Sequence, residues 1–292
     1  MSGNGFDEVI FEIDGEAVPE EVAEEAERIS RSSAGRGKRF LDNALPTATV
    51  VGTLIFLWWL ASALDIWPEY LVPSPATVVS RFAEKLASGE ITIAVLTSLR
   101  RVAIGFAVAL ILGGALGLTI TASKFLGKGL GSLVLGLQSL PSICWLPLAF
   151  LWFGISETTI LFVVVMGALP SVALGLRSGI QNLPPQYERA GRNLGAQGWT
   201  LYRRVIIPAA LPAFLGGIEQ GWAFAWRSLM AAEIIFFGLG LGQILETGRQ
   251  LSDLALVMTA IISIIAIGVI VDGVVFGAAR RAIRTRWGLM GA

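Results

Sequence analysis

Three ionisable residues, Glu219, Arg227 and Glu233, lie within one apolar run. A charged side chain in the membrane interior is costly, so such residues usually face a cavity or a partner. The guanidinium of Arg227 carries bidentate donors that suit a small oxyanion such as nitrate, a sulfonate or bicarbonate. We therefore expect Arg227 to line a path for a small anion. The alternative is that Arg227 forms an internal ion pair with Glu219, Glu233 or Asp272 and only holds the helices together.

Two prolines interrupt another apolar run close to several polar side chains. Gln138 and Ser142 flank Pro141, and Trp145 comes shortly before Pro147. A proline removes a backbone hydrogen bond and kinks a helix, and such a kink can line a cavity. The alternative is that the bend serves packing alone. The candidate residues of a translocation path are Gln138, Ser142, Trp145, Glu219, Trp226, Arg227 and Glu233.

The inventory of reactive residues argues against catalysis, metal binding and nucleotide binding. The chain has no histidine, and its single cysteine, Cys144, lies in an apolar run where we expect a buried packing residue. No nucleophile elbow occurs, and no G-x-x-x-x-G-K-[ST] loop is present to hold ATP phosphates. The glycine clusters GKGLG at 127–131 and GLGLG at 238–242 are typical of span ends and turns. We expect no catalytic residue, no metal site and no cofactor in this chain.

The composition is that of a polytopic membrane protein. Of the 292 residues, 54% are hydrophobic and 15% are charged, whereas a soluble domain carries about 25% charged residues. A bilayer core takes about 20 apolar residues in a helix, whose backbone satisfies its own hydrogen bonds. We predict an all-α bundle of six transmembrane helices. Their expected ranges are 49–66, 102–122, 130–153, 158–176, 209–237 and 254–279.

The placement of lysine and arginine predicts the orientation of these helices. With six spans, both termini share one side of the membrane. That side carries 16 of the 22 basic residues, the other side carries five, and Arg227 lies within a span. Because cytoplasmic loops carry an excess of lysine and arginine, both termini are expected in the cytoplasm. The connection over residues 67–101 is then external, and its residues 76–88 have the spacing of an amphipathic helix.

We divide the chain into a tail, residues 1–45, and a transmembrane domain, residues 46–292. Ten of the 22 acidic residues fall within the first 27 positions, and basic residues follow them. This composition is typical of a flexible, solvated arm. The alternative is that the tail docks onto a partner. The tail lacks the basic-then-apolar order of a cleavable signal peptide.

A polar, basic segment over residues 181–208 separates the fourth and fifth spans. Its spacing predicts one short helix over 187–194 and a break at Gly195. A second short helix is expected over 197–207, ending before Pro208. The segment is thus a pair of helices outside the bilayer.

The second helix of this pair carries an aromatic face. Trp199, Tyr202 and Val205 or Ile206 recur at helical spacing. An exposed apolar face of this kind needs a partner surface. The face either folds back against the chain's own bundle or inserts into the groove of a soluble partner.

The segment resembles the cytoplasmic signature loop of permease subunits in binding-protein-dependent ABC importers. That loop reads Glu-Ala-Ala, three residues, Gly, nine residues, then Ile-x-Leu-Pro. Gly195 provides the glycine, and VIIP at 205–208 provides a conservative ending. Arg-Ala-Gly at 189–191 occupies the Glu-Ala-Ala positions, and the acid comes one place earlier, at Glu188. The resemblance implies that the residues coupling the chain to an ATPase are Glu188, Ala190, Gly191, Gly195, Trp199, Tyr202, Val205 and Pro208.

Other stretches are similar to the nitrate, sulfonate, taurine and bicarbonate branch of these permeases. They are LVPSPATVV at 71–79, SLRRVAIGFAVAL at 98–110, LPSICWLPLAFLWFG at 140–154 and FAWRSLMAAE at 224–233. The resemblance extends from about Leu71 to Leu289. It implies the type I ABC importer permease fold, a MetI-like helix bundle of the bacterial inner membrane.

The resemblance also implies a function and a set of partners. The chain would translocate a small anion by alternating access: an aliphatic sulfonate first, with nitrate, taurine or bicarbonate close behind. It would pair with a second permease copy, giving a homodimer or a heterodimer. Two cytoplasmic ATPase subunits would bind ATP and Mg, and an external binding protein would deliver the substrate. The alternative is a secondary transporter or channel driven by an ion gradient, although the two halves show no convincing inverted repeat.

Overall fold

The structure is a computed structural model that describes residues 45–236 and 238–286. The predicted tail, residues 1–45, lies almost entirely outside these residues. The chain divides into two compact units, Met1–Trp67 and Pro68–Ala292. The first unit contributes one described helix, Leu45–Ala63, which is long and apolar enough to cross a membrane. This helix agrees with the predicted span at 49–66.

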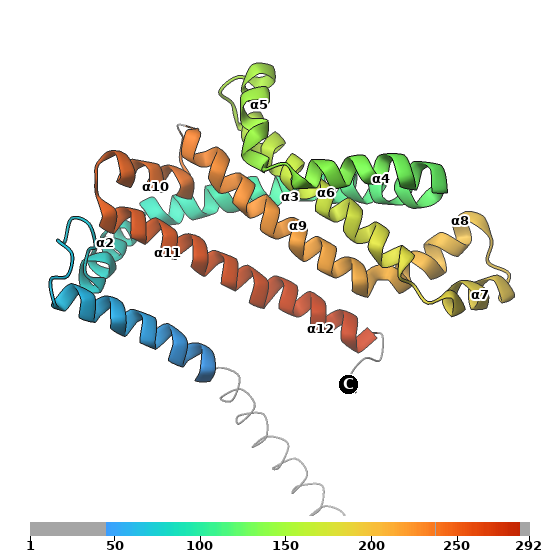
Figure 1. Cartoon of the computed structure of the whole chain (residues 1–292), viewed down its shortest axis with the longest axis horizontal. Helices are drawn as coiled ribbons and strands as arrows, with labels where there is room; N and C mark the ends of the chain where they lie inside the picture. The colour runs from blue at the N-terminus through green and yellow to red at the C-terminus, as the bar shows by residue number, and fades with distance from the viewer. Residues whose placement is uncertain (1–44, 237, 287–292) are drawn as a thin grey trace, which may run out of the picture. The chain divides into compact units, whose positions relative to one another are not determined.

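All secondary structure elements in the described residues of the second unit are helices, and they include the remaining long apolar helices (Figure 1). Its principal helices are α3 (Glu90–Ala122), α6 (Glu157–Gln181), α9 (Ile207–Ile235) and α11 (Leu254–Val271). A π-helical turn joins α11 to α12 (Gly277–Arg286). The described residues hold five candidate membrane spans, or six when one strongly bent helix pair is included. The predicted all-α bundle with six spans is confirmed.

The core of the second unit forms where α6 packs against both α3 and α9. Small residues allow this close approach, as is usual between membrane helices. A Cβ on Gly217 of α9 would lie 2.5 Å from the Cα of Gly175 in α6. On the other side of α6, a Cβ on Gly113 of α3 would lie 2.9 Å from the carbonyl oxygen of Leu169. The backbones therefore meet directly on both faces of α6.

Gly175→Ala is expected to destabilise the bundle, because the new methyl group collides with the backbone at Gly217 rather than with a movable side chain. Overpacking of this kind costs about 1–3 kcal/mol. The thermal unfolding midpoint of the detergent-purified protein measures the effect. Gly216→Ala is the matched control, because a Cβ there has open space within 4 Å. Equal midpoints for the two variants would contradict the packing argument.

The predicted third span, 130–153, is wrong as a single helix, because the chain breaks at Leu140. It forms α4 (Lys124–Ser139), a 3₁₀ turn (Ser142–Trp145) and α5 (Leu146–Phe153), with a bend of 100°. A proline disfavours helical geometry at the residue before it, and Leu140, which precedes Pro141, is extended at φ −75° and ψ 125°. Pro147 lies in the first turn of α5, where a proline is tolerated.

Two short helices lie between the spans. The expected helix at 76–88 is confirmed as α2 (Pro75–Ala87), capped by Ser74. It packs on α11 through Val78, which is 1% exposed. α10 (Leu241–Gln250), which begins within the GLGLG stretch, was not predicted.

Candidate functional site

A cleft of about 460 Å³ opens beside the break between α4 and α5. The end of α4, the 3₁₀ turn, α6 and α9 all contribute to its wall. Its polar lining includes Gln138, Ser142 and Arg227. The structure thus brings together three of the seven residues predicted for a translocation path, from segments about 90 residues apart in the chain.

Arg227 is the cation of this cleft and has no acidic partner among the described residues. Its neighbours Trp226 and Ser228 are buried in the core, while Arg227 itself is exposed. Its guanidinium lies 5.1 Å from the ring centre of Phe224, another residue of the wall. A guanidinium over an aromatic face is held without being neutralised. Its hydrogen-bond donors therefore remain available to an anion.

The internal ion pair that was the alternative for Arg227 does not form, because all three acids have other cations. Glu219 accepts a hydrogen bond of 2.8 Å from Arg280, which also pairs with Asp272 at 3.3 Å. Glu233 pairs with Arg101 at 2.9 Å. The tertiary structure therefore pairs these three acids with Arg280 and Arg101 and leaves none of them for Arg227.

The polar groups around Arg227 are held by close packing of α6. Gln138 donates a hydrogen bond of 3.1 Å to Ser171 of α6. Gly167 leaves space for Ser228 of α9, since a side chain there would collide with the Ser228 hydroxyl. A guanidinium, an amide and a hydroxyl in one cleft offer several donors to a small oxyanion.

The other four residues predicted for the path do not line this cleft. Trp145 packs edge to face on Phe162 at 6.2 Å between ring centres, and Trp226 is buried and stacked at 6.3 Å on Trp222. Glu219 and Glu233 belong to the ion pairs described above. The sequence showed that Glu219 and Glu233 are charged residues within a span, but it did not show towards which neighbour each side chain points. Cys144, expected to be buried, is exposed because the chain leaves the helix at this turn.

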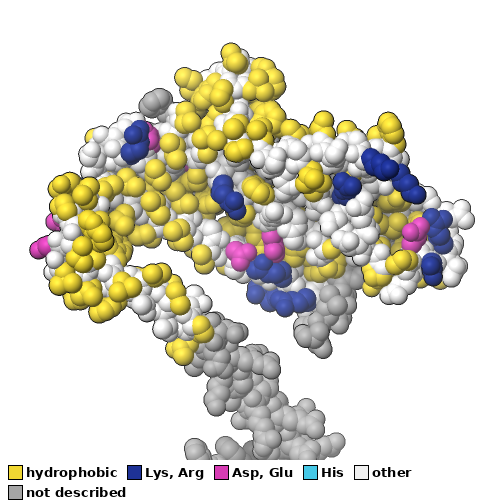
Figure 2. All heavy atoms as spheres, viewed as in Figure 1, with side chains coloured by type: hydrophobic (Ala, Val, Ile, Leu, Met, Phe, Trp, Pro, Cys, Tyr) yellow, Lys and Arg dark blue, Asp and Glu magenta, His cyan; other side chains and the backbone are white. Residues whose placement is uncertain are grey.

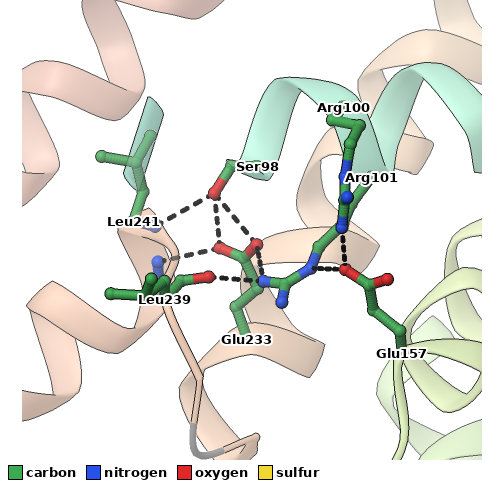
Figure 3. Close-up of polar contacts among 8 residues, drawn as sticks. Ser98, Arg100, Arg101, Glu157, Glu233, Leu239 and Leu241 are labelled. Atoms are coloured by element: carbon green, nitrogen blue, oxygen red, sulfur yellow. Dashed lines mark hydrogen bonds and ion pairs between the residues drawn. The ribbon is translucent and has the colours of Figure 1, made fainter. Parts of the chain in front are cut away.

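A buried polar cluster lies at the end of the bundle opposite the 181–208 segment (Figure 3). At its centre is the carboxylate of Glu233, whose residue is 1% exposed. It accepts hydrogen bonds from Ser98 at 2.7 Å, from Arg101 at 2.9 Å and from the backbone N–H of Gly242 at 3.1 Å. Full satisfaction of this kind is what a buried charge requires.

Arg101 extends the cluster to two further elements (Figure 3). It donates to the carbonyl oxygen of Leu239 at 2.7 Å and to Glu157 at 3.2 Å. Glu157 opens α6 and also pairs with Arg100. The cluster therefore ties the start of α3, the start of α6 and the end of α9 to the turn before α10.

The cluster also explains the GLGLG stretch. A Cβ on Gly240 would lie 2.6 Å from the Cδ atom of Glu233, and a Cβ on Gly242 would lie 2.5 Å from its Cβ atom. The glycines leave the space that the carboxylate occupies. The prediction that this stretch is a span end and a turn is correct. Gly240 and Gly242 are glycines in this turn because any side chain there would collide with Glu233.

α10 carries one strongly perturbed carboxyl group. Hydrogen bonds from Arg249 and Gln250 lower the pKa of Glu246 to about 2, well below its usual value. The bonds from Arg249 are the larger cause. Glu246 is therefore ionised across the physiological pH range, and its stabilising contribution would be lost only as the pH falls from about 4.5 towards 2.

The segment between the fourth and fifth spans contains the expected pair of helices. The first is α7 (Pro185–Asn193), and the second begins as α8 (Gly198–Leu201). Gly195 between them has φ +81°, a left-handed conformation that favours glycine. The break at this residue is confirmed.

The predicted end of the second helix before Pro208 is wrong. A π-helical turn over Tyr202–Ile206 joins α8 to α9 without interruption. Within it, the N–H of Ile207 bonds to the carbonyl oxygen of Tyr202. A wider turn of this kind admits the ring of Pro208 in the first turn of α9. The backbone is therefore helical without a break from α8 into α9.

The pair is packed through one small residue. A Cβ on Gly191 would lie 2.7 Å from Leu201 and 3.0 Å from Val205, so glycine lets α7 approach the second helix. Tyr202 and Val205 are partly buried on this inner side. The predicted aromatic face is therefore not a single exposed surface: Tyr202 and Val205 are partly buried, whereas Trp199 is exposed.

Two large apolar side chains of the segment remain uncovered. Trp199 is 65% exposed and Leu194 is 88% exposed. Glu188 and Ala190 are also exposed, and Glu188 is paired with Arg192 at 2.7 Å. Pro208 is partly buried at the start of α9. Leu194 was not predicted, although its position beside Gly195 at the tip of the pair is readable from the sequence.

Comparisons with known proteins agree with this architecture. The model of the family described as "Binding-protein-dependent transport system inner membrane component" matches residues 105–284. The chain is 31% identical to SsuC of Escherichia coli, described as an aliphatic sulfonates transport permease, over 80% of this chain and 89% of that protein. It is 29% identical to the nitrate import permease protein NrtB of Synechocystis, over 62% and 66% of the respective chains. It is 28% identical to the taurine transport system permease protein TauC of E. coli, over 74% and 82%.

A solved structure shares the fold. A chain of the MetNI methionine ABC transporter, in inward-facing conformations, superposes with a TM-score of 0.51. The match covers 67% of this chain and 94% of that chain at 19% identity. The arrangement of helices around α6 is therefore that of a type I ABC importer permease.

Proposed function

Because the chain belongs to the family of binding-protein-dependent ABC importer permeases of the inner membrane, in its nitrate, sulfonate and taurine branch, we propose that it imports a small oxyanion. An aliphatic sulfonate is the first candidate substrate, and nitrate, taurine and bicarbonate follow. SsuC of Escherichia coli, which is 31% identical to this chain, is described as an aliphatic sulfonates transport permease.

The observation that carries the proposal is the unneutralised guanidinium of Arg227 in a largely apolar cleft that also contains Gln138 and Ser142. Nitrate and a sulfonate group each present a pair of oxygens to which a guanidinium donates two hydrogen bonds. Gln138 and Ser142 add neutral donors without adding charge. Neutral donors of this kind suit a translocation path, because the anion must be released after it has been bound.

The same cleft supports a pair of permease copies. A charged side chain within a span does not face lipid, and Arg227 is exposed in the single chain. A second copy placed over this cleft would close it into a water-filled path. We favour a homodimer, since one gene product then supplies both walls.

The exposed tip around Leu194 and Trp199 is proposed as the docking site of a cytoplasmic ATPase. Each permease would bind one ATPase subunit, which supplies the ATP and Mg site. An external binding protein would deliver the anion at the opposite end. Closure of the two ATPases would move α7 and α8, and the continuous backbone into α9 would carry that motion to the cleft.

Arg227→Ala is expected to lower sulfonate uptake at least tenfold in cells that express the complete importer. A charge-assisted hydrogen bond contributes about 1.5–3 kcal/mol, and Arg227→Lys should restore part of the uptake because it retains the charge. Co-purification with the ATPase should be unchanged for both variants. Full uptake by Arg227→Ala would contradict the role of this residue in the path.

A further inference from the structure

A second cavity, of about 290 Å³, opens where α3 ends, α4 begins and α6 ends. Three cationic side chains line it: Lys124, Lys128 and Arg177. The hydroxyl-bearing residues Thr121 and Ser123 lie beside them, and no acidic residue is part of the lining. The cavity therefore collects positive charge, and the transport path described above does not use it.

None of these cations is neutralised within the described part of the chain. No carboxylate of residues 45–236 and 238–286 lies within ion-pair distance of Lys124, Lys128 or Arg177. The Nε atom of Arg177 is buried and has no hydrogen-bond partner. Leaving a buried donor unpaired is unfavourable. A bound anion with several oxygens would supply the missing acceptor.

The positions of the three cations suit a single multivalent anion. Lys124 and Lys128 lie one helical turn apart on the same side of α4. Both lie near the N-terminus of α4, where the helix dipole adds partial positive charge. Arg177 comes from α6, and Gly131 of α4 makes room for its guanidinium, which a side chain at that position would hit.

α4 also carries exposed apolar side chains. Phe125 is 87% exposed, and Leu133 and Leu135 are 60% and 61% exposed. Figure 2 shows lysine and arginine side chains gathered towards the end of the second unit that carries the start of α4, α7 and α8. Cations beside an exposed apolar helix face match a molecule with an anionic head and apolar chains.

We propose that Lys124, Lys128 and Arg177 bind a phosphate group, and that the phosphate is the headgroup of an anionic phospholipid. The end of α6 leads into α7, so the site lies on the membrane side of residues 181–208, which we call the coupling segment after their proposed role. That side is the cytoplasmic one in the orientation predicted from the basic residues. The bound lipid would hold the broken α4–α5 span against α6.

The test measures phospholipid binding to the purified full-length permease by native mass spectrometry. Phosphatidylglycerol should bind the unmodified protein more tightly than phosphatidylcholine does. Each lysine or arginine near a membrane surface contributes about fivefold to the affinity for anionic lipid. The double variant Lys124→Gln, Lys128→Gln should therefore lose on the order of 25-fold in affinity for phosphatidylglycerol. Both side chains are exposed, so folding should be retained.

Arg203→Gln, Arg204→Gln is the matched control, since it removes two exposed cations from the coupling segment on the same side. An equal loss of affinity in this control, or no loss in the lysine double variant, would overturn the proposal. Inorganic phosphate is added in a separate arm. Competition by millimolar phosphate would assign the site to free phosphate, and its absence would assign it to the lipid headgroup. Unchanged lipid binding with lost ATPase co-purification would identify a protein contact instead and overturn the proposal.

Discussion

Arg101→Met is expected to destabilise the permease by about 3–5 kcal/mol, because it leaves the carboxylate of Glu233 buried without its counterion. Arg101 and Glu233 are 6% and 1% exposed in their side chains, so water cannot replace the lost partner. The variant also removes the hydrogen bonds that Arg101 donates to Leu239 and Glu157. The start of α3 would then lose its connection to the turn before α10.

Thermal unfolding in detergent, followed by tryptophan fluorescence, measures this effect. Arg227→Met is the matched control, since it deletes an arginine that has no acidic partner among the described residues. The control should change the midpoint little. A midpoint for Arg101→Met no lower than that of Arg227→Met would show that the ion pair does not stabilise the fold.

A second substitution separates loss of charge balance from loss of packing. Arg101→Met combined with Glu233→Leu removes both charges and leaves Ser98 and the N–H of Gly242 without their shared acceptor. Replacement of a whole buried pair is often close to neutral. The double variant should therefore recover part of the stability that the single variant loses.

Trp199→Ala combined with Leu194→Ala is expected to abolish measurable coupling to the ATPase, while the permease still folds. Both side chains are largely exposed, so their removal does not open a cavity in the bundle. Exposed apolar anchors that fill a partner's pocket commonly cost 2 kcal/mol or more each when truncated. Two such losses would lower the affinity for the ATPase by roughly a thousandfold.

Co-purification of the ATPase and ATP-dependent uptake in vesicles measure the coupling variant. Trp152→Ala is the matched control, because Trp152 of α5 is also exposed, at 59%, but precedes α6 rather than following it. It lies at the other end of the bundle from the coupling segment. Normal ATPase binding by the Trp199 and Leu194 variant would exclude the tip as the docking site.

The hydropathy and turn residues of this sequence determined the parts of the fold that depend on local chemistry. Long apolar runs must form helices in a bilayer, because their backbone groups have no other partners there. Pro141 disrupts helical geometry at Leu140, and Gly195 permits a left-handed turn. Each of these effects acts within a few residues, so the sequence indicates where the helices are disturbed. It did not indicate the 100° bend that divides the predicted span 130–153.

The tertiary structure alone decided which charges are structural and which remain free. Arg101 reaches Glu233 across 132 positions, and Arg280 reaches Glu219 across 61. These pairings leave Arg227 without a carboxylate partner. The sequence offered three candidate partners for Arg227, but it gave no distance to any of them. Electrostatic pairing depends on separations of a few ångströms. Such separations are set by how whole helices pack, as at Gly175 and Gly217, and not by the spacing of charges along the chain.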